Sequence, residues 1–114
     1  MANDDVLTQI GEMVKKNKIL IFMKGTPSLP MCGFSAATIQ VFDALDVPYE
    51  TVDVLEDAAV REGVKRYSKW PTIPQVYING EFIGGCDIVR EMFETGELAQ
   101  LLAARDVKTA AAPT

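Results

Sequence analysis

The sequence predicts an α/β fold, with a four-stranded mixed sheet and helices on both faces, and three observations indicate it. Residues 19–23, I-L-I-F-M, are uniformly apolar, which is typical of a strand buried on both faces. Residues 75–84 hold two β-rich runs joined by Asn79-Gly80, which indicates a hairpin because both central turn positions need positive φ. Helical and strand-like patterns alternate before this hairpin, which favours a β-α-β unit followed by a helix.

Apolar residues at helical spacing predict a helix at the start of the chain. They are Val6, Leu7, Ile10, Met13 and Val14. Asn3, Asp4 or Asp5 is expected to cap this helix. The strand at residues 19–23 follows it, and a loop rich in glycine and proline occupies residues 25–31.

The rest of the chain supplies the remaining helices and strands. A helix is predicted from about residue 33 to 45, where Val47-Pro48 ends it, with one side formed by Phe34, Ala37, Thr38, Val41 and Leu45. A strand is expected within residues 49–54 and a helix over 58–68. After the hairpin, Gly84-Gly85 leads into a helix whose inner side is expected to hold Ile88, Val89, Met92 and Phe93. A last helix follows after an interrupting glycine, so the order is helix, strand, helix, strand, helix, strand, strand, helix, helix.

The length and charge of the chain limit its organisation and its partners. We expect residues 1–105 of the 114 to form one domain, followed by a flexible tail at 106–114. No apolar run approaches the ~20 residues that cross a bilayer, so no membrane is expected as a partner. The net charge of −5 argues against nucleic acid, because phosphate contacts need a basic surface. The acidic N-terminus lacks a signal-peptide pattern, which favours the cytoplasm, although an organelle protein trimmed of its transit peptide would look the same.

Cys32 is the candidate catalytic residue, because it follows the first strand at the start of a helix, where α/β folds place their sites. Unpaired amide groups at a helix N-terminus lower a thiol pKa, and so does a nearby ammonium group, for which Lys24 is the candidate. We therefore expect a reactive thiolate, the alternative being a cysteine that only packs. Cys86, at another helix start, is expected to be structural. The chain has no histidine, which excludes an imidazole base and histidine ligands.

Three segments carry a resemblance to a known family. They are M-K-G-T-P-S-L-P-M-C-G-F-S, W-P-T-I-P-Q-V-Y-I-N-G and G-G-C-D-I. In this order and spacing they resemble the monothiol glutaredoxins of the CGFS type, and the likeness runs from the first helix to about Leu102. The resemblance implies a thioredoxin fold, in agreement with the predicted element order. It also implies glutathione as the ligand and a BolA-like protein as a heterodimer partner.

The resemblance further implies which residues hold glutathione. It makes the Ile73-Pro74 bond a cis peptide, which leaves the backbone N–H and C=O of Ile73 free to pair with glutathione. It assigns Arg61 and Lys24 to the glycine carboxylate, and the helix start at residues 84–87 to the γ-glutamyl end. The assigned residues are Lys24, Arg61, Ile73, Pro74, Gly85, Cys86 and Asp87. From the residues alone, the cations Arg61, Lys65 and Lys69 are equally consistent with a solvated helix face, and the glycines with a turn.

Ser35 stands where a redox protein often carries a second cysteine, so Cys32 has no neighbouring thiol to resolve a mixed disulfide. A [2Fe–2S] cluster with all-sulfur ligation takes four thiolates, and one exposed cysteine per chain supplies one of them. Two chains and two glutathione molecules complete the set. This arithmetic predicts a homodimer with Cys32 as the metal ligand, as the resemblance also implies. The alternative set is Cys32 and Cys86 from each of two chains, without glutathione.

Three functions are compatible with these features. The first is a carrier that delivers a [2Fe–2S] cluster to apo iron–sulfur client proteins. The second is a glutathione-dependent oxidoreductase that acts on glutathionylated proteins through Cys32. The third is an adaptor whose cysteine is incidental. The lack of a resolving thiol and the longer loop at residues 25–31, which in the family accompanies weak reductase activity, favour the carrier.

Overall fold

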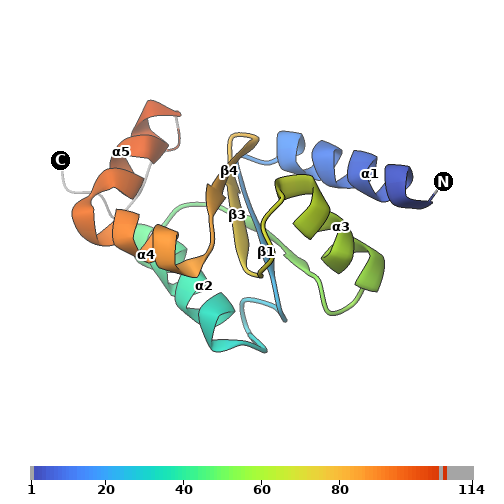
Figure 1. Cartoon of the computed structure of the whole chain (residues 1–114). Coiled ribbons are helices and arrows are strands. Elements are labelled where there is room, and N and C mark those ends of the chain that lie inside the picture. Colours follow the sequence, from blue (N-terminus) through green and yellow to red (C-terminus); the bar gives the residue numbers. More distant parts are fainter. Residues whose placement is uncertain (1, 106, 108–114) are drawn as a thin grey trace.

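The computed structural model describes residues 2–105 and 107, in the element order that the sequence predicts (Figure 1). The helices are α1 (Ala2–Lys16), α2 (Gly33–Leu45), α3 (Ala58–Ser68), α4 (Cys86–Thr95) and α5 (Glu97–Ala104). The strands are β1 (Ile19–Met23), β2 (Glu50–Asp53), β3 (Gln75–Ile78) and β4 (Glu81–Gly84). Of the tail expected at residues 106–114, only Val107 lies within the described residues, and its side chain is buried.

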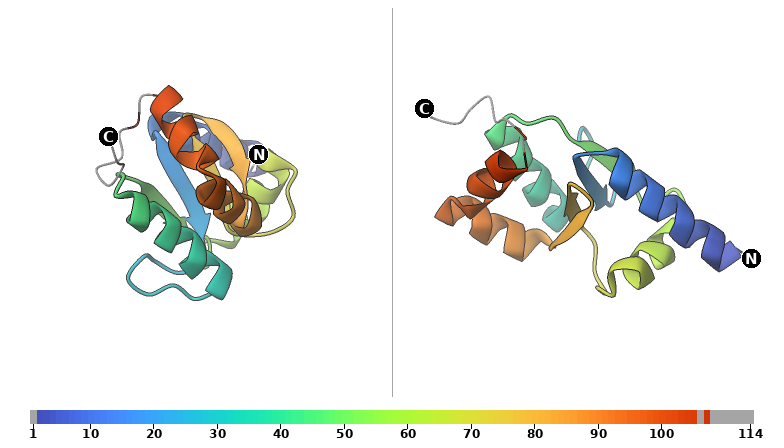
Figure 2. Two further views of the ribbon diagram at one scale, coloured as in Figure 1. Left: turned by 90° about the vertical axis from the view of Figure 1, so that its left-hand side faces the viewer. Right: turned by 90° about the horizontal axis from the view of Figure 1, so that it is seen from above.

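The four strands form one mixed sheet in the order β2-β1-β3-β4. β1 pairs parallel with β2 and antiparallel with β3, and β3 pairs antiparallel with β4. Helices cover both faces, as predicted: α1 and α3 lie on one side of the sheet, and α2, α4 and α5 on the other (Figures 1 and 2). Since β1 and β2 are parallel, their carboxyl ends meet at one edge of the sheet, where Met23 pairs with Asp53.

β1 is buried along its whole length because its side chains alternate between two cores. Ile19, Ile21 and Met23 pack in a core with residues of α2, α4 and α5. Leu20 and Phe22 pack in a second core with residues of α1 and α3. The predicted strand with two buried faces is therefore confirmed, and it fixes the position of the loop that follows it.

The hairpin turn has the backbone that its residues indicate. Asn79 has a φ of 54° and Gly80 a φ of 85°, so both central positions are left-handed. The turn pairs β3 with β4 so that Val76 lies opposite Gly84. As a result, the residues before β3 and those after β4 lie side by side at the same edge of the sheet as the carboxyl end of β1.

Several details of the predicted helices are wrong. α1 begins at Ala2, so Asn3, Asp4 and Asp5 lie within its first turn instead of capping it. The helix extends further toward the N-terminus than the apolar periodicity marks, and helix boundaries are poorly fixed by periodicity. Phe34 is 63% exposed, whereas it was expected on the same side of α2 as the buried Thr38. The neighbouring Ser35 is completely buried, so the first turn of α2 is packed, but the side chain of Phe34 lines an open cleft and not the core.

The inner side of α4 also differs from the prediction. Val89 is buried and Met92 packs against the core, as expected, but Ile88 and Phe93 are each 37% exposed. Cys86 is the other buried residue of the helix, and it lies at the end of α4 that lines the cleft described below. Ile88 is left on the flank of the helix. Among the described residues, no helix is long and apolar enough to span a bilayer.

Candidate functional site

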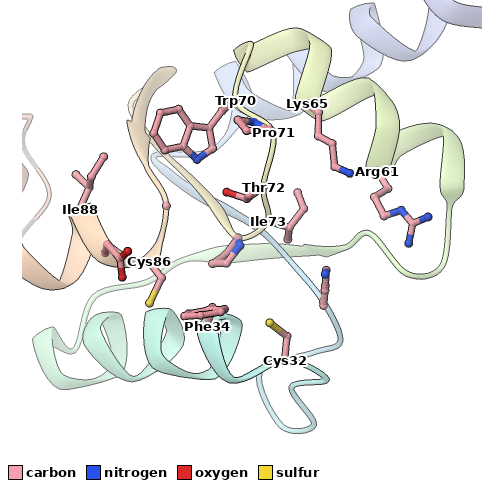
Figure 3. A pocket seen from close by; sticks show the side chains of 14 residues that line it. Cys32, Phe34, Arg61, Lys65, Trp70, Pro71, Thr72, Ile73, Cys86 and Ile88 are labelled. Atoms are coloured by element: carbon pink, nitrogen blue, oxygen red, sulfur yellow. The ribbon is translucent and has the colours of Figure 1, made fainter.

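A cleft of about 570 Å³ lies at the carboxyl edge of β1, between α2, α3, the segment before β3 and the start of α4 (Figure 3). The residues that the sequence analysis assigned to the catalytic and glutathione-binding site all line it. They are Lys24, Cys32, Arg61, Ile73, Pro74, Gly85, Cys86 and Asp87. The fold thus brings together residues from four segments of the chain. Other residues that the sequence reasoning did not assign to a site complete the lining: Phe34, Lys65, Trp70, Pro71, Thr72 and Ile88.

Cys32 is the N-cap residue of α2, with an extended backbone (φ −156°, ψ 134°). Its carbonyl oxygen accepts the first helical hydrogen bond, from the N–H of Ala36 at 2.9 Å. Its thiol is free and partly exposed. The side chain therefore lies at the point where the amide groups of the first turn are not used by the helix itself.

These amide groups lower the pKa of the Cys32 thiol. The largest cause is the backbone N–H of Ser35, and the N–H of Phe34 and the hydroxyl of Ser35 add to it, while desolvation by burial opposes them. The positive charge of Lys24 also lowers the pKa, but it is the smallest of these causes. The predicted direction is confirmed. The helix N-terminus, and not the lysine, supplies most of the effect.

Ser35 connects the thiol to the end of β1. Its side chain is completely buried, and its hydroxyl accepts a hydrogen bond from the backbone N–H of Lys24 at 3.1 Å. A hydroxyl also has a proton to donate, and that proton is directed to the sulfur of Cys32 as one of the causes of its lowered pKa. Ser35 therefore contributes to the environment of the Cys32 thiol, in addition to occupying the position of the second cysteine in a dithiol pair.

The pH dependence of Cys32 alkylation tests which groups contribute most to the lowered pKa of the thiol. In a Cys86→Ser background, the rate with iodoacetamide is expected to fall with a midpoint below about 8.5, the pKa of an unperturbed thiol, as the pH drops through the lowered pKa. Ser35→Ala is expected to raise the midpoint more than Lys24→Gln does, because the hydroxyl is the larger cause. A larger rise in Lys24→Gln would show that the lysine charge dominates.

The loop between β1 and α2 is held at its base by β2. The N–H of Met31 donates to the carbonyl of Lys24 at 2.9 Å, and Gly25 forms a β-bridge with Pro30. The N–H of Gly25 donates to the carboxylate of Asp53 at 2.9 Å. Asp53 is far from the loop in sequence, so no local pattern marked it. The loop is therefore closed before Cys32 and fixes where the thiol lies.

The segment before β3 forms the opposite wall of the cleft. The Ile73-Pro74 peptide bond is cis, as the resemblance implies. Within the part of the chain that the structure describes, no hydrogen bond uses the backbone N–H or C=O of Ile73. Gly85 packs closely against this wall, since a Cβ there would lie 3.2 Å from the carbonyl oxygen of Pro74 and 3.5 Å from Nε1 of Trp70. This approach is close enough to favour glycine at position 85.

Two cations of α3 reach the cleft. Arg61 and Lys65 both line it, one helical turn apart, whereas Lys69 ends the helix in a left-handed conformation and does not. Nε of Arg61 is buried and forms no hydrogen bond with any described residue, although it lies 3.7 Å from a carboxylate oxygen of Glu62. The i, i+4 spacing was the signal that could have added Lys65 to the predicted site.

The start of α4 closes the cleft. Gly85 is its N-cap residue and offers no side-chain cap, and the exposed Asp87 lies in its first turn. Cys86 is a free thiol that is only 6% exposed, and its sulfur faces the cleft (Figure 3). Among residues 2–105 and 107, no group of three or more histidine, cysteine or carboxylate side chains could hold a metal ion. One chain therefore offers no complete metal site among these residues.

Comparison with known proteins agrees with this geometry. The profile of the glutaredoxin family matches residues 19–83. A ycf64-like monothiol glutaredoxin of Synechocystis is 51% identical over 100 residues, which cover 88% of this chain and 94% of that protein. The solution structure of reduced poplar apo GrxS14 has a TM-score of 0.80 and 43% identity, and covers 92% of this chain and 97% of that one.

A third likeness is to the crystal structure of a buckwheat glutaredoxin–glutathione complex. Its TM-score is 0.83 at 25% identity, over 95% of this chain and 96% of that one. These structural likenesses confirm the thioredoxin fold. This chain shares half of its residues with a monothiol glutaredoxin over most of both chains. It therefore belongs to the glutaredoxin family and, within it, to the monothiol glutaredoxins.

Proposed function

We propose that this monothiol glutaredoxin binds glutathione in the cleft and carries a [2Fe–2S] cluster between two subunits. The observation that carries the proposal is the Cys32 thiol, whose pKa is lowered and which lies in a cleft with cations and unpaired backbone groups. The chain has no second thiol next to it, because Ser35 fills that position. A soft thiolate of this kind suits iron–sulfur ligation.

The cleft has groups for each end of glutathione. Lys24 and Arg61 are proposed to bind the glycine carboxylate, for which charge-assisted hydrogen bonds are strong. The backbone N–H and C=O of Ile73, beside the cis Pro74, are proposed to pair with the central peptide, as one residue of strand addition. The glutathione complex of the buckwheat glutaredoxin, which has the same fold, supports this use of the cleft.

The γ-glutamyl end of glutathione carries a carboxylate and an amine. The first turn of α4, at Gly85 and Cys86, is proposed to hold the carboxylate, because unpaired N–H groups and the helix dipole favour an anion there. The exposed carboxylate of Asp87 is proposed to bind the amine. In this arrangement the sulfur of glutathione lies toward Cys32, between the two walls of the cleft.

Replacing Arg61 by glutamine is expected to weaken glutathione binding. The side chain is 42% exposed, so we expect a modest loss, with Kd rising roughly three- to tenfold in isothermal titration calorimetry at low salt. Arg66→Gln is the matched control, because Arg66 lies on the same helix, is exposed and does not line the cleft. An equal loss in both variants would mean that only the net charge matters and would contradict the assignment of Arg61.

The cluster requires more thiolates than one chain offers. Four are needed, Cys32 is the accessible one in each chain, and two glutathione thiolates complete the set across a homodimer. Exposed apolar side chains border Cys32 on the loop and on α2: Leu29 is 68%, Met31 62% and Phe34 63% exposed. An apolar rim of this kind is a surface that a second subunit can cover. It supports the homodimer and a heterodimer with a BolA-like protein equally.

The alternative function is a glutathione-dependent oxidoreductase. The Cys32 thiolate would attack the glutathione sulfur of a glutathionylated protein, which releases the protein thiolate and leaves Cys32 joined to glutathione. A second glutathione would then attack that bond and leave as oxidised glutathione, restoring the Cys32 thiolate. The lowered pKa of Cys32 favours this chemistry as well. It needs only one protein cysteine, so Ser35 is compatible with it.

Anaerobic reconstitution separates the two functions. The protein would be incubated with iron, sulfide and glutathione, and visible absorption, mass and turnover of a glutathione mixed disulfide would be recorded. A brown dimer with slow turnover supports the carrier, whereas a colourless monomer with fast turnover supports the enzyme. As a carrier, the protein would deliver its cluster to apo iron–sulfur client proteins, and we propose that it does so in the cytoplasm.

A further inference from the structure

Gln75 is a completely buried polar side chain next to the cleft, at the first position of β3. Its amide nitrogen donates to the carbonyl of Trp70 at 3.0 Å and to the carbonyl of Thr72 at 3.2 Å. Its amide oxygen accepts a hydrogen bond from the hydroxyl of Tyr77 at 3.3 Å. Both amide hydrogens and the oxygen therefore have partners, and the two carbonyls settle which end of the amide is the nitrogen.

A structural role in the core would not require glutamine at this position. Burying an amide is unfavourable unless its hydrogen bonds are satisfied, and an aliphatic side chain would fill the same volume without that cost. The amide oxygen of Gln75 contacts the hydroxyl of Tyr77. The ring of Tyr77 packs against Phe22, Tyr67 and Phe82, with distances between ring centroids of 5.7, 5.9 and 5.4 Å. The specific property that glutamine adds is a pair of donors directed at two backbone carbonyls.

Those carbonyls belong to the wall of the cleft. Residues 70–74, the wall segment, line it from the indole of Trp70 to the cis proline (Figure 3). At its start, the N–H of Trp70 donates to Lys65 and Ser68 of α3. Among the described residues, only Gln75 donates to the carbonyls of Trp70 and Thr72. Gln75 therefore holds the two carbonyls on either side of Pro71 toward the interior.

This arrangement determines what the wall presents to a ligand. With the carbonyls of Trp70 and Thr72 turned inward, the backbone of Ile73, which follows directly, is left without an internal partner in the described part of the chain. The same bond holds the backbone of Trp70, and the indole ring packs against Phe82 at a centroid distance of 5.8 Å. Gln75, which does not line the cleft, thus adds two hydrogen bonds to the wall segment beyond those that α3 supplies at Trp70.

We propose that Gln75 is a positioning residue that presents the wall segment to glutathione. The inference rests on the proposed binding of glutathione in the cleft. It predicts that loss of the two amide donors weakens glutathione binding without changing the Cys32 thiol, because the groups that lower the thiol pKa all belong to α2 and Lys24.

Two substitutions separate positioning from general stability. Gln75→Met keeps the length and removes all three hydrogen bonds, whereas Tyr77→Phe removes the bond to the amide oxygen and the interaction of the tyrosine hydroxyl with Ser68 but leaves both bonds of Gln75 to the wall segment. Gln75→Asn is a milder variant, with an amide one methylene too short to reach, and replaces Gln75→Met if circular dichroism shows that the latter is unfolded.

Two readouts follow the wall segment. Glutathione affinity is measured by calorimetry, and acrylamide quenching reports on Trp70 directly because it is the single tryptophan of the chain. We expect Gln75→Met to raise the Kd about tenfold and to increase quenching of the ligand-free protein, while Tyr77→Phe stays within about twofold of the wild type in both. The pH midpoint of Cys32 alkylation is expected to be unchanged in both variants.

The outcomes distinguish this inference from the proposed function. An unchanged Kd in Gln75→Met, or an equal loss in Tyr77→Phe, would overturn the positioning role. If the wild type binds no glutathione, the proposed function fails. In that case acrylamide quenching of Trp70 still tests whether Gln75 holds the wall segment. Unchanged quenching in the Gln75 variants would show that it does not.

Discussion

Replacing Cys32 by serine is expected to abolish cluster binding and all glutathione disulfide chemistry while leaving the fold intact. The variant has no accessible thiolate, since the remaining cysteine, Cys86, is only 6% exposed. Serine is a preferred N-cap residue and Cys32 makes no side-chain cap in α2, so the free energy of unfolding should change by no more than about 1 kcal/mol. Absorption after anaerobic reconstitution and mass spectrometry after treatment with oxidised glutathione measure the two losses.

Cys86→Ser is the matched control for this experiment. It removes the other cysteine of the same cleft by the same chemical change, and we expect it to keep the cluster and the mixed disulfide at Cys32. Loss of the cluster in Cys86→Ser, together with assembly that needs no glutathione, would instead identify the ligand set with both cysteines of each chain. A cluster that survives in Cys32→Ser would refute the site itself.

Replacing Gly25 by alanine is expected to disrupt the loop that delivers Cys32. Gly25 has a φ of 91°, and a Cβ there would lie 2.5 Å from the carbonyl oxygen of Leu29 and 2.6 Å from the amide nitrogen of Met31. These are backbone atoms, so the clash cannot be relieved by turning a side chain. We expect a loss of about 3 kcal/mol in the free energy of unfolding, or local opening of the loop. Urea denaturation measures the first, and hydrogen exchange measures the second.

Gly96→Ala separates the clash from the backbone conformation. Gly96 has a φ of 86°, close to that of Gly25, but a Cβ there would meet nothing within 4 Å. Only the cost of placing alanine in the left-handed region applies, about 1 kcal/mol. The alkylation midpoint of Cys32 should move toward that of an ordinary thiol in Gly25→Ala and stay unchanged in Gly96→Ala. Equal stability losses in the two variants would mean that the loop tolerates the added carbon.

The parts of the fold that local patterns determine were predicted correctly from the sequence. The apolar run of β1 required burial on both faces, and Asn79-Gly80 required positive φ at both turn positions. The position of Cys32 at the start of α2 followed from the same patterns. The direction of its pKa shift followed from helix physics that holds wherever such a helix begins.

Features that depend on three-dimensional packing were not predictable in this way. Asp53 holds the loop at Gly25, and Gln75 holds the carbonyls of Trp70 and Thr72, through contacts that no local pattern encodes. The exposure of Phe34 depends on the cleft that other segments form beside the first turn of α2.

The residues of the cleft likewise differ in how far local sequence patterns could predict their roles. The amide groups of α2 and the charge of Lys24 were both expected to lower the thiol pKa, but the sequence could not rank them, because the relative size of these causes depends on geometry. Arg61, Gly85 and Asp87 were assigned through the family resemblance, and spacing alone would have left them as a solvated face and a turn. The structure brings all three to the lining of one cleft.

Native mass spectrometry of the anaerobically reconstituted protein tests the central proposal most directly. We expect a mass equal to two chains, one [2Fe–2S] cluster and two glutathione molecules, with each chain contributing Cys32. The same species should disappear when glutathione is removed. A cluster-containing dimer whose mass includes no glutathione, or a protein that remains a colourless monomer under these conditions, would contradict it.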